Sequence, residues 1–316
     1  MFFFPECKVV WAPPPHLCLP PRDDNLSFAD ERIAKVVVEA TRFHDLVLVH
    51  HPNIRQQIAS IGPRNVNSIT ATEVEKFYQA LERLTSQARE RIDLNVIVVS
   101  THGLVDVPRR NIRVLDDYLS MELLQTSIGN GAVKQLIAVT GKTHQVYLQL
   151  RNHTPIPNVK VYYTTPKIGD MPEWYHYRKS ATVPDLVLVA QPGYAILTRD
   201  PSKQISQQQP PEVQAGMSGY NNHYPELLGV FLAYGPVFRK GYHKGSLQLC
   251  DIYTLICVIL HIDGCHTSCG RITHVGDILT NDARSVLRAA VHRSGRVTAA
   301  RTSLVIIVLV IYFYEQ

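Results

Sequence analysis

Five side chains that could bind a metal ion or transfer a proton directly follow two apolar runs of the sequence, namely His50, His51, Asn53, Thr101 and His102. Imidazole is a common ligand of transition metals, so one interpretation is a single-metal site that these histidines form together with His44. A second interpretation makes Thr101 a nucleophile and His102 its base. Adjacent residues on a strand point to opposite faces, which disfavours a direct hydrogen bond between these two. We favour the simplest interpretation, in which His50 and His51 are surface residues after a strand.

The two apolar runs have the composition of buried strands. Residues 46–49 and 95–100 consist mainly of leucine and β-branched residues, which is typical of strands that are covered on both faces. Between them, from Thr70, apolar residues recur at helical spacing and predict an amphipathic helix of about five turns. The order strand, helix, strand predicts a parallel sheet with a right-handed crossover. Chemistry collects at the carboxyl ends of such strands, so we expect the five side chains near one another.

The rest of the sequence predicts a mixture of helices and strands. Ser27 is a suitable N-cap for a helix over residues 28–40, because a serine hydroxyl can accept a hydrogen bond from the first turn. Strands are predicted at 136–140, 145–150, 159–163, 186–190 and 231–235, a second apolar helix at 251–261, and a loop at 201–214.

Composition places the chain among ordinary globular proteins. The 316 residues carry a net charge of +5, and 45% of them are apolar, which excludes a disordered tail, a collagen-like fibre and a histone-like basic protein. Charged residues make up only 19%, so nucleic acid is not an expected partner. A chain of this length can bury one large core or two modest ones.

A series of sequence blocks occurs in an order that resembles a known family. The blocks are FADERI at 28–33, VIVVSTHGL at 96–104, MPEWYHY at 171–177, GYNN at 219–222, FLAYGPVF at 231–238 and DIYTLIC at 251–257. Together they resemble the ectonucleotide pyrophosphatase/phosphodiesterase family of the alkaline phosphatase superfamily, from about residue 2 to about residue 279. The resemblance implies an α/β fold of the alkaline phosphatase-like type, a mostly parallel sheet with helices on both faces, here with its N-terminal strands missing. It also implies metal-dependent hydrolysis of nucleotide or other phosphodiester bonds, outside the cell or at a membrane.

The resemblance implies two zinc ions and a threonine nucleophile, but few of the family's functional residues are retained. The family's Ser-Asp-His-Gly block reads Ser-Thr-His-Gly here, so His102 is retained and Thr101 replaces a carboxylate. Residues 53–59 lack the expected aspartate and histidine, and Ser218 stands at the last metal histidine. The nucleophile and the first metal aspartate belong to a family segment that precedes these blocks. We therefore expect His102 as the only retained metal ligand, no catalytic residue and no tightly bound zinc, because hydroxyls and amides are poor zinc ligands.

The resemblance divides the chain into a partial phosphodiesterase domain, residues 1–281, and a divergent tail, residues 282–316. An apolar run begins at Leu304 and ends at Tyr314. It is shorter than the ~20 residues of a membrane-spanning helix, so we favour a partly buried terminal strand or helix over a tail anchor. A sheet without its first strands exposes apolar edges, from which we expect marginal stability or a protein partner that covers them. A nucleotide or another small phosphodiester is the expected ligand.

The cysteines and two glycosylation signals are relevant to the cellular compartment in which the protein resides. The six cysteines permit disulfides without requiring them, and Asn-x-Ser/Thr signals at Asn25 and Asn152 fit an extracellular glycoprotein. The N-terminus has no signal-peptide core, since Pro5 and charged residues follow Phe4. A zinc knuckle formed by Cys265, His266, Cys269 and His274 is a weaker interpretation than a disulfide or free thiols.

The aromatic run 174–177 could stack a base, but we favour a strand at the rim of the core.

Three functions remain, and the sequence favours them in a fixed order. The first is a divergent family hydrolase with no or very weak turnover. The second is a pseudoenzyme that binds a ligand or a protein partner, and the third is an active hydrolase with an unfamiliar set of metal ligands.

Overall fold

The structure is a computed structural model that describes residues 2–3, 16, 37–51, 53–65, 68–89, 94–164, 169–175, 177, 183–199, 214–262, 269–283 and 303–309. The chain forms two compact units. The first unit comprises Met1–Arg55, Ser68–Thr101 and Gly229–Tyr312, and the second comprises Gln56–Asn67, His102–Leu228 and Phe313–Gln316. The chain therefore passes between the units several times, among them after residue 55, between Thr101 and His102, and between Leu228 and Gly229.

A five-stranded, mostly parallel sheet forms the centre of the first unit. Its strands are β1 (Phe2–Phe3), β2 (Leu46–His50), β13 (Ser303–Leu309), β3 (Leu94–Ser100) and β12 (Phe231–Tyr234), in that spatial order. The pairs β1–β2, β2–β13 and β13–β3 are parallel, whereas β12 runs antiparallel to β3 at the edge. The predicted parallel sheet is confirmed. The two strands of the predicted βαβ unit are not direct neighbours, because β13 lies between them.

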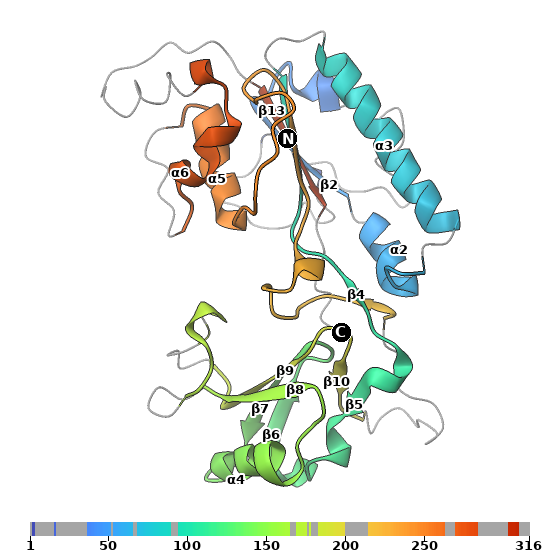
Figure 1. The fold of residues 1–316 in the computed structure, drawn as a ribbon, viewed down its shortest axis with the longest axis vertical. Coiled ribbons are helices and arrows are strands. Elements are labelled where there is room, and N and C mark those ends of the chain that lie inside the picture. The colour runs from blue at the N-terminus through green and yellow to red at the C-terminus, as the bar shows by residue number, and fades with distance from the viewer. Residues whose placement is uncertain are drawn as a thin grey trace. The chain divides into compact units, whose positions relative to one another are not determined.

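Helices cover both faces of this sheet. On one face, α3 (Ser68–Arg89) packs Phe77, Ala80 and Leu84 against alternate residues of β2 and β3. On the other face, α5 (Leu249–Ile259) packs Ile252, Leu255 and Ile259 against Ile97 and Val99 of β3. Figure 1 shows α3 on one side of the strands and α5 with α6 (Ile272–Val275) on the other. Successive residues of β3 alternate between the two cores, as the period of two in a strand requires.

The start of α5 is fixed by a buried carboxylate and a disulfide. Asp251 is 1% exposed and forms a capping box, in which its carboxylate accepts a hydrogen bond from the amide of Gln248 at 3.1 Å. The same side chain accepts from the amide of Arg271 at 3.0 Å and contacts His274 Nδ1 at 3.3 Å. A disulfide joins the neighbouring Cys250 to Cys269. These contacts connect the first turn of α5 to the start of α6. The capping box also satisfies free amides at the N-terminus of α5.

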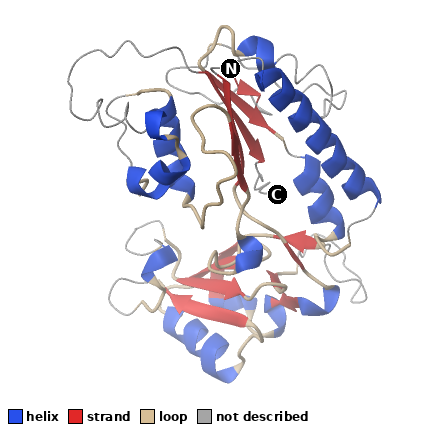
Figure 2. Cartoon of the chain, turned by 45° about the horizontal axis from the view of Figure 1, so that its top comes forward, coloured by secondary structure: helices blue, strands red, loops and turns tan. Residues whose placement is uncertain are grey.

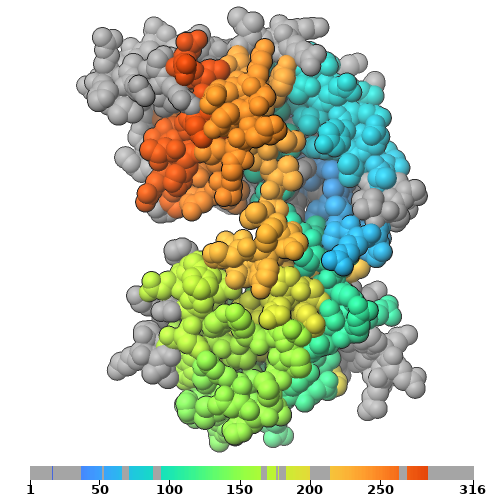
Figure 3. Space-filling view, viewed as in Figure 1, coloured from blue at the N-terminus to red at the C-terminus, as the bar shows by residue number. Residues whose placement is uncertain are grey.

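An antiparallel sheet of four strands forms the centre of the second unit. The strands β6 (Leu124–Ile128), β7 (Val133–Ala138), β9 (Leu186–Ala190) and β8 (Val159–Tyr163) follow one another in that order. Helix α4 (Thr143–Leu148), which continues as the π-helix η4 (Gln149–His153), packs on this sheet (Figure 2). The chain segment that builds this sheet covers much of the visible surface of its unit in Figure 3.

Short elements complete the second unit. They are β4 (Val105–Asp106), paired with β11 (Gly216–Met217); β5 (Ile112–Val114), paired with β10 (Ala195–Leu197); and the 3-10 turns Arg109–Asn111, Leu115–Asp117, Met121–Leu123, Glu173–Tyr175 and Pro225–Leu227. Another 3-10 turn, Gly276–Ile278, follows α6 in the first unit.

A lysine is fully buried within the second unit. Lys134 on β7 is 1% exposed, and its Nζ donates to Gly129 O at 2.7 Å, to Asn130 Oδ1 at 2.9 Å and to Thr198 Oγ1 at 3.2 Å. Burial lowers the pKa of Lys134 to about 8, and the charge of Asp116 opposes the shift. All three ammonium protons have acceptors, as burial of a charge requires. Lys134 therefore ties the β6–β7 turn to the end of β10.

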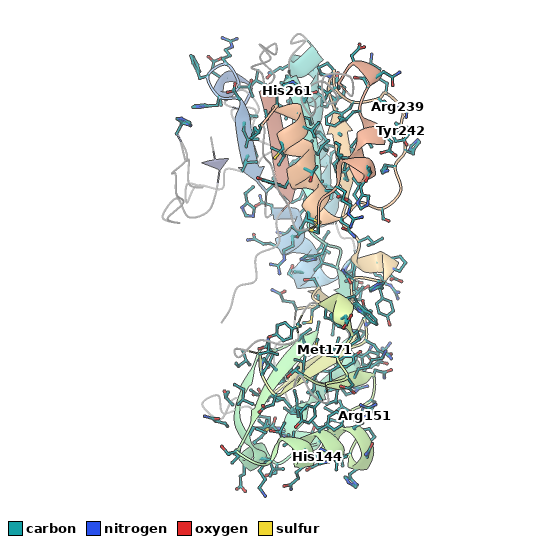
Figure 4. The ribbon with its side chains drawn as sticks, turned by 90° about the vertical axis from the view of Figure 1, so that its left-hand side faces the viewer. His144, Arg151, Met171, Arg239, Tyr242 and His261 are labelled. Atoms are coloured by element: carbon teal, nitrogen blue, oxygen red, sulfur yellow. A yellow bond between two sulfur atoms is a disulfide. The ribbon has the colours of Figure 1, made fainter. Side chains whose placement is uncertain are left out.

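Each unit has an exposed arginine that contacts an aromatic ring or a carboxylate. Figure 4 shows Arg239 next to Tyr242 in the first unit, and its guanidinium carbon lies 4.2 Å from the ring centroid. In the second unit, Arg151 follows His144 on the α4–η4 segment and pairs with Asp170. These contacts are exposed, so each contributes little to stability.

Several expectations about local structure are wrong or fall outside the described residues. The predicted strand at 145–150 is helical, because Val146 and Leu150 are four residues apart and both face the core of the second unit. Helix α2 (Asn53–Ile61), for which no element was predicted, follows β2. Of the predicted helix 28–40, only residues 37–40 are described, and they are helical. Of the predicted loop 201–214, only residue 214 is described.

The apolar run near residue 304 contributes a strand, as one of the two favoured interpretations predicted. Ser303–Leu309 pairs with both β2 and β3. Among the described residues, no helix combines the length and the apolar character needed to cross a membrane.

Candidate functional site at the carboxyl ends of β2 and β3

The histidines after β2 lie in the interior of the first unit. His51 is 3% exposed, and its ring centroid lies 5.3 Å from that of Phe77 on α3. Burial lowers the pKa of His51 to about 4, although the charge of Glu73 opposes the shift. The expectation that His50 and His51 are surface residues is therefore wrong for His51, and His50 is half-buried. The apolar side of α3 covers this strand end, so His51 is a neutral core residue at pH 7.

Two hydroxyl residues, Ser100 and Thr101, lie at the end of β3, and Ser100 contacts the residue before the edge strand β12. Ser100 donates its amide to Val230 O at 2.9 Å, and its Oγ accepts from the amide of Val230 at 2.7 Å. Thr101 Oγ1 is buried and has no hydrogen-bond partner among the described residues. A buried hydroxyl without a partner is energetically costly. The threonine oxygen is thus available to a ligand or a water molecule at this strand end.

Strand β13 separates the two strand ends of the first unit. Its residue Val308 is in register with His50, and Leu309 is in register with Ser100. Because β2 and β3 are two strand spacings apart, their backbones are separated by roughly 10 Å. The structure therefore places the histidines of β2 and Thr101 at the same edge of the sheet but not on neighbouring strands.

His102 is the first residue of the segment His102–Leu228, which forms most of the second unit. Its Nδ1 lies 2.7 Å from the carbonyl oxygen of Gly103. A carbonyl can only accept, so Nδ1 carries the proton and Nε2 has the lone pair, the tautomer that a metal ligand needs. Gly103 donates its amide to Leu227 O at 2.9 Å, and a Cβ at this position would overlap the carbonyl oxygen of Glu226. Only glycine fits after His102.

Asp106 is a carboxylate that the sequence analysis did not single out. It lies on β4, where it is in register with Gly216, two residues before Ser218. Its Oδ1 accepts from the amide of Arg64 at 3.2 Å, and its Oδ2 lies 3.3 Å from Arg64 Nε. The same carboxylate packs against Gly62, whose φ of +87° requires glycine. The signal that could have revealed it is its position two residues after the sequence block that contains His102.

The other candidate sites are occupied by structural contacts. Cys269 is disulfide-bonded to Cys250, and His274 contacts Asp251, so neither is available to a zinc knuckle. Cys265 and His266 lie outside the described residues. Asp45 is exposed, and the ring of His44 lies 5.9 Å from that of His16. Among the described residues, no group of three or more histidine, cysteine, aspartate or glutamate side chains could hold a metal ion.

The aromatic run forms a 3-10 turn, Glu173–Tyr175, and not the expected strand. Tyr175 and Tyr177 pack on a small apolar core, and burial raises the pKa of Tyr175 to about 12. Trp174 is 53% exposed. Its ring lies 5.9 Å from that of Tyr175 and 5.6 Å from that of His223. Packing accounts for the tyrosines, and His176 lies outside the described residues.

The positions that the resemblance matched to zinc ligands carry donors that do not fit two zinc ions. Residues 53–61 form α2, which provides amide, aliphatic and guanidinium side chains, including the half-buried Arg55. Ser218 provides a hydroxyl and Thr101 another, and Asp106 is paired with Arg64. Zinc binds imidazole, thiolate and carboxylate. Among the positions matched to zinc ligands, His102 offers an imidazole.

A mostly parallel sheet that is covered by helices on both faces, with histidine and hydroxyl residues at its strand ends, defines an α/β fold of the alkaline phosphatase-like type. A family model for type I phosphodiesterase / nucleotide pyrophosphatase matches residues 1–221. The chain belongs to this family.

Two relatives with similar sequences support the assignment to the family. The chain is 28% identical over 245 residues to human ectonucleotide pyrophosphatase/phosphodiesterase family member 5, covering 77% of this chain and 48% of the relative. It is 27% identical over 189 residues to a human bis(5'-adenosyl)-triphosphatase, covering 60% and 38%. The chain spans about half the length of the human family member 5, or less for the triphosphatase.

Solved structures of family member 5 share the fold. The human protein superposes with a TM-score of 0.69 at 25% identity, covering 84% of this chain and 67% of that one. An inactive form of the murine protein in complex with AMP superposes with a TM-score of 0.68 at 26% identity, covering 83% and 66%.

Proposed function

We propose that this chain binds a nucleotide or another small phosphodiester and hydrolyses it very slowly or not at all. The observation that carries the proposal is the set of donors at the positions matched to the zinc ligands. Family membership supports the ligand class, and the murine relative is described in complex with AMP. The remaining donor atoms support weak metal affinity.

The side chains at the positions matched to zinc ligands support weak binding of divalent cations. Two Zn²⁺ ions need several anionic or imidazole ligands to compensate their charge. Here Thr101 and Ser218 are neutral, and Arg55 adds a positive charge on α2. Asp106 could reach a metal only by giving up its ion pair with Arg64. Without two metal ions, the phosphorus of a bound ester is less electrophilic and its leaving oxygen is less stabilised.

Thermal unfolding with EDTA and then with excess zinc tests metal affinity. A ligand that binds only the folded state raises the melting temperature, so we expect no resolved shift between the two conditions. Turnover of a chromogenic nucleotide phosphodiester is measured in parallel, and we expect a rate at the uncatalysed background. A shift of several degrees, with turnover that is lost in His102→Ala and retained in the surface variant His144→Ala, would contradict the proposal and indicate an active hydrolase with a different metal set.

Calorimetric titration with AMP in the presence of EDTA tests the binding part separately. We expect saturable binding that weakens when salt is added, because charge attraction to a phosphate is screened. A titration without a binding signal, with or without zinc, would contradict nucleotide binding. It would favour the alternative in which the domain is a protein-binding module.

We also propose that the protein is an extracellular glycoprotein. The disulfide between Cys250 and Cys269 supports an oxidising compartment, and Asn152 is exposed within its glycosylation signal. Expression through a secretory pathway should give a product whose mass falls on treatment with a glycosidase. The mass change should disappear when Asn152→Gln and Asn25→Gln are combined, and an unchanged mass of the wild-type chain would contradict the assignment.

A further inference from the structure

Strand β13 occupies the middle of the sheet although it is separated by a long stretch of sequence from both neighbours. It pairs in parallel with β2 over Leu304–Val308 and with β3 over Ser303–Leu309. These two neighbours are the strands that carry His50 and Thr101 to the candidate site. The strand that joins the two halves of the site-bearing sheet is therefore supplied from residues 303–309.

The space between β2 and β3 has the shape and chemistry of a slot for one parallel strand. Two strands that lie two spacings apart cannot hydrogen-bond to each other, so without β13 each would present a row of unpaired amides and carbonyls. The strand that fills the slot is SLVIIVL, and the central residues of its neighbours are valine, isoleucine and leucine. The described strand contains no charged residue that would oppose pairing with another chain.

The connection to β13 is long enough to reach another molecule. Residues 284–302 join Ala283 at the end of the preceding described segment to Ser303. Fully extended, this segment spans at most roughly 60 Å, which exceeds the distance across one sheet. The chain can therefore place the same strand in its own slot or in the slot of a neighbouring copy.

We propose that β13 is an exchangeable strand, and that two copies of this chain form a dimer in which each inserts residues 303–309 into the slot between β2 and β3 of the other. The pairing inside the slot is identical in the monomer and in the dimer, so the exchange costs little once the strand is free. In the dimer, Val308 and Leu309 opposite His50 and Ser100 belong to the partner copy, which then contributes backbone to the candidate site of each subunit.

Refolding at different protein concentrations tests the exchange. The full chain is unfolded and refolded at low and high concentration, and its mass is measured by light scattering after size exclusion. We expect a dimer whose fraction rises at least tenfold over the concentration series and persists on dilution. Two differently tagged preparations should form mixed dimers when refolded together and not when mixed after folding, which separates strand exchange from surface association. A chain that is monomeric at every concentration overturns the proposal.

A proline variant identifies the strand responsible. Ile306 pairs with Leu48 and with Ile97 at the centre of β13, where proline removes a ladder hydrogen bond. Ile306→Pro should reduce the dimer fraction at least tenfold. The matched control is Ile272→Pro, because Ile272 is the first residue of α6 and follows Arg271 with an extended backbone, ψ 132°, a position that accepts proline. Equal dimer fractions in both variants overturn the proposal.

Shortening the connection provides a test that does not depend on the folding of the proline variant. Deletion of residues 289–296 shortens the connection between Ala283 and Ser303 from 19 residues to 11. A shortened hinge favours exchange between copies, so the dimer fraction should rise. A deletion variant that folds and stays as monomeric as the wild-type chain contradicts strand exchange.

Discussion

The buried imidazole of His51 should make the first unit less stable in mild acid. Its pKa is about 4 in the folded chain, against an ordinary value of 6.5, so between these values the unfolded chain binds more protons than the folded one. Stability from this residue is complete above pH 6.5 and is lost as the pH falls towards 4. A shift of this size corresponds to about 2.5 kcal/mol of lost unfolding free energy at pH 4.5 compared with pH 7.

The assay is urea unfolding followed by far-UV circular dichroism at pH 7 and pH 4.5, for the wild-type chain and for His51→Leu. Leucine retains contact with Phe77 and cannot be protonated, so the variant should lose about 2 kcal/mol less than the wild-type chain between the two pH values. Any hydrogen bond that the substitution removes affects both pH values and cancels in this difference. His144→Leu on the exposed side of α4 is the control and should follow the wild-type chain. The reasoning is refuted if His51→Leu and the wild-type chain lose equal stability on acidification.

Three further substitutions have effects that follow from contacts already described. Lys134→Met should lower the unfolding free energy by about 2 kcal/mol in urea, because it removes the three hydrogen bonds that the buried ammonium donates; an unchanged midpoint would mean that water replaces the ammonium. Gly103→Ala should lower the melting temperature by several degrees, because its Cβ meets a backbone carbonyl, whereas Gly276→Ala, where a Cβ meets open space, should not; equal melting temperatures would argue against the close approach. Replacing both Cys250 and Cys269 with serine should cost about 3 kcal/mol by denaturant titration, the loss expected for opening a loop that is closed over a sequence separation of 19, and a loss below about 0.5 kcal/mol would show that the capping box alone holds the start of α5.

The sequence predicts the strands well where the apolar pattern is unambiguous. The continuous runs at β2, β3 and β9 require burial on both faces, and this pattern also predicts a sheet between two layers of helices. Residues 145–150 show the limit of the method, since a short segment with apolar residues at alternating positions fits a strand and a helix equally well. Only the position of Val146 and Leu150 in the core decides between them.

Residues of the site were harder to predict because their environment comes from distant parts of the chain. The burial of His51 depends on Phe77, and the role of Asp106 depends on Arg64 and Gly62. The assignment of His102 as a retained metal ligand rests on its sequence block and stays a prediction, whereas its tautomer follows from a contact to the next carbonyl. The domain boundary at residue 281 and the loss of zinc affinity stay predictions.

The place of β13 in the sheet was not predictable from its composition. An apolar run shows that a segment is buried or paired, but nothing in the run specifies which strands accept it. Parallel pairing between residues 303–309 and two strands before residue 101 is a long-range contact, and such contacts leave no local signature.

During synthesis on the ribosome, the sheets of the two units are completed at different times. The four-stranded sheet of the second unit lies between Leu124 and Ala190, so all of its strands are available while later segments are still being made. The first unit receives its central strand only when residue 309 has left the exit tunnel, about 200 residues after β3. At the usual rates of synthesis, β2 and β3 wait for roughly 10 to 40 seconds without the strand that joins them. During that interval a nascent chain of this protein is a natural client for chaperones.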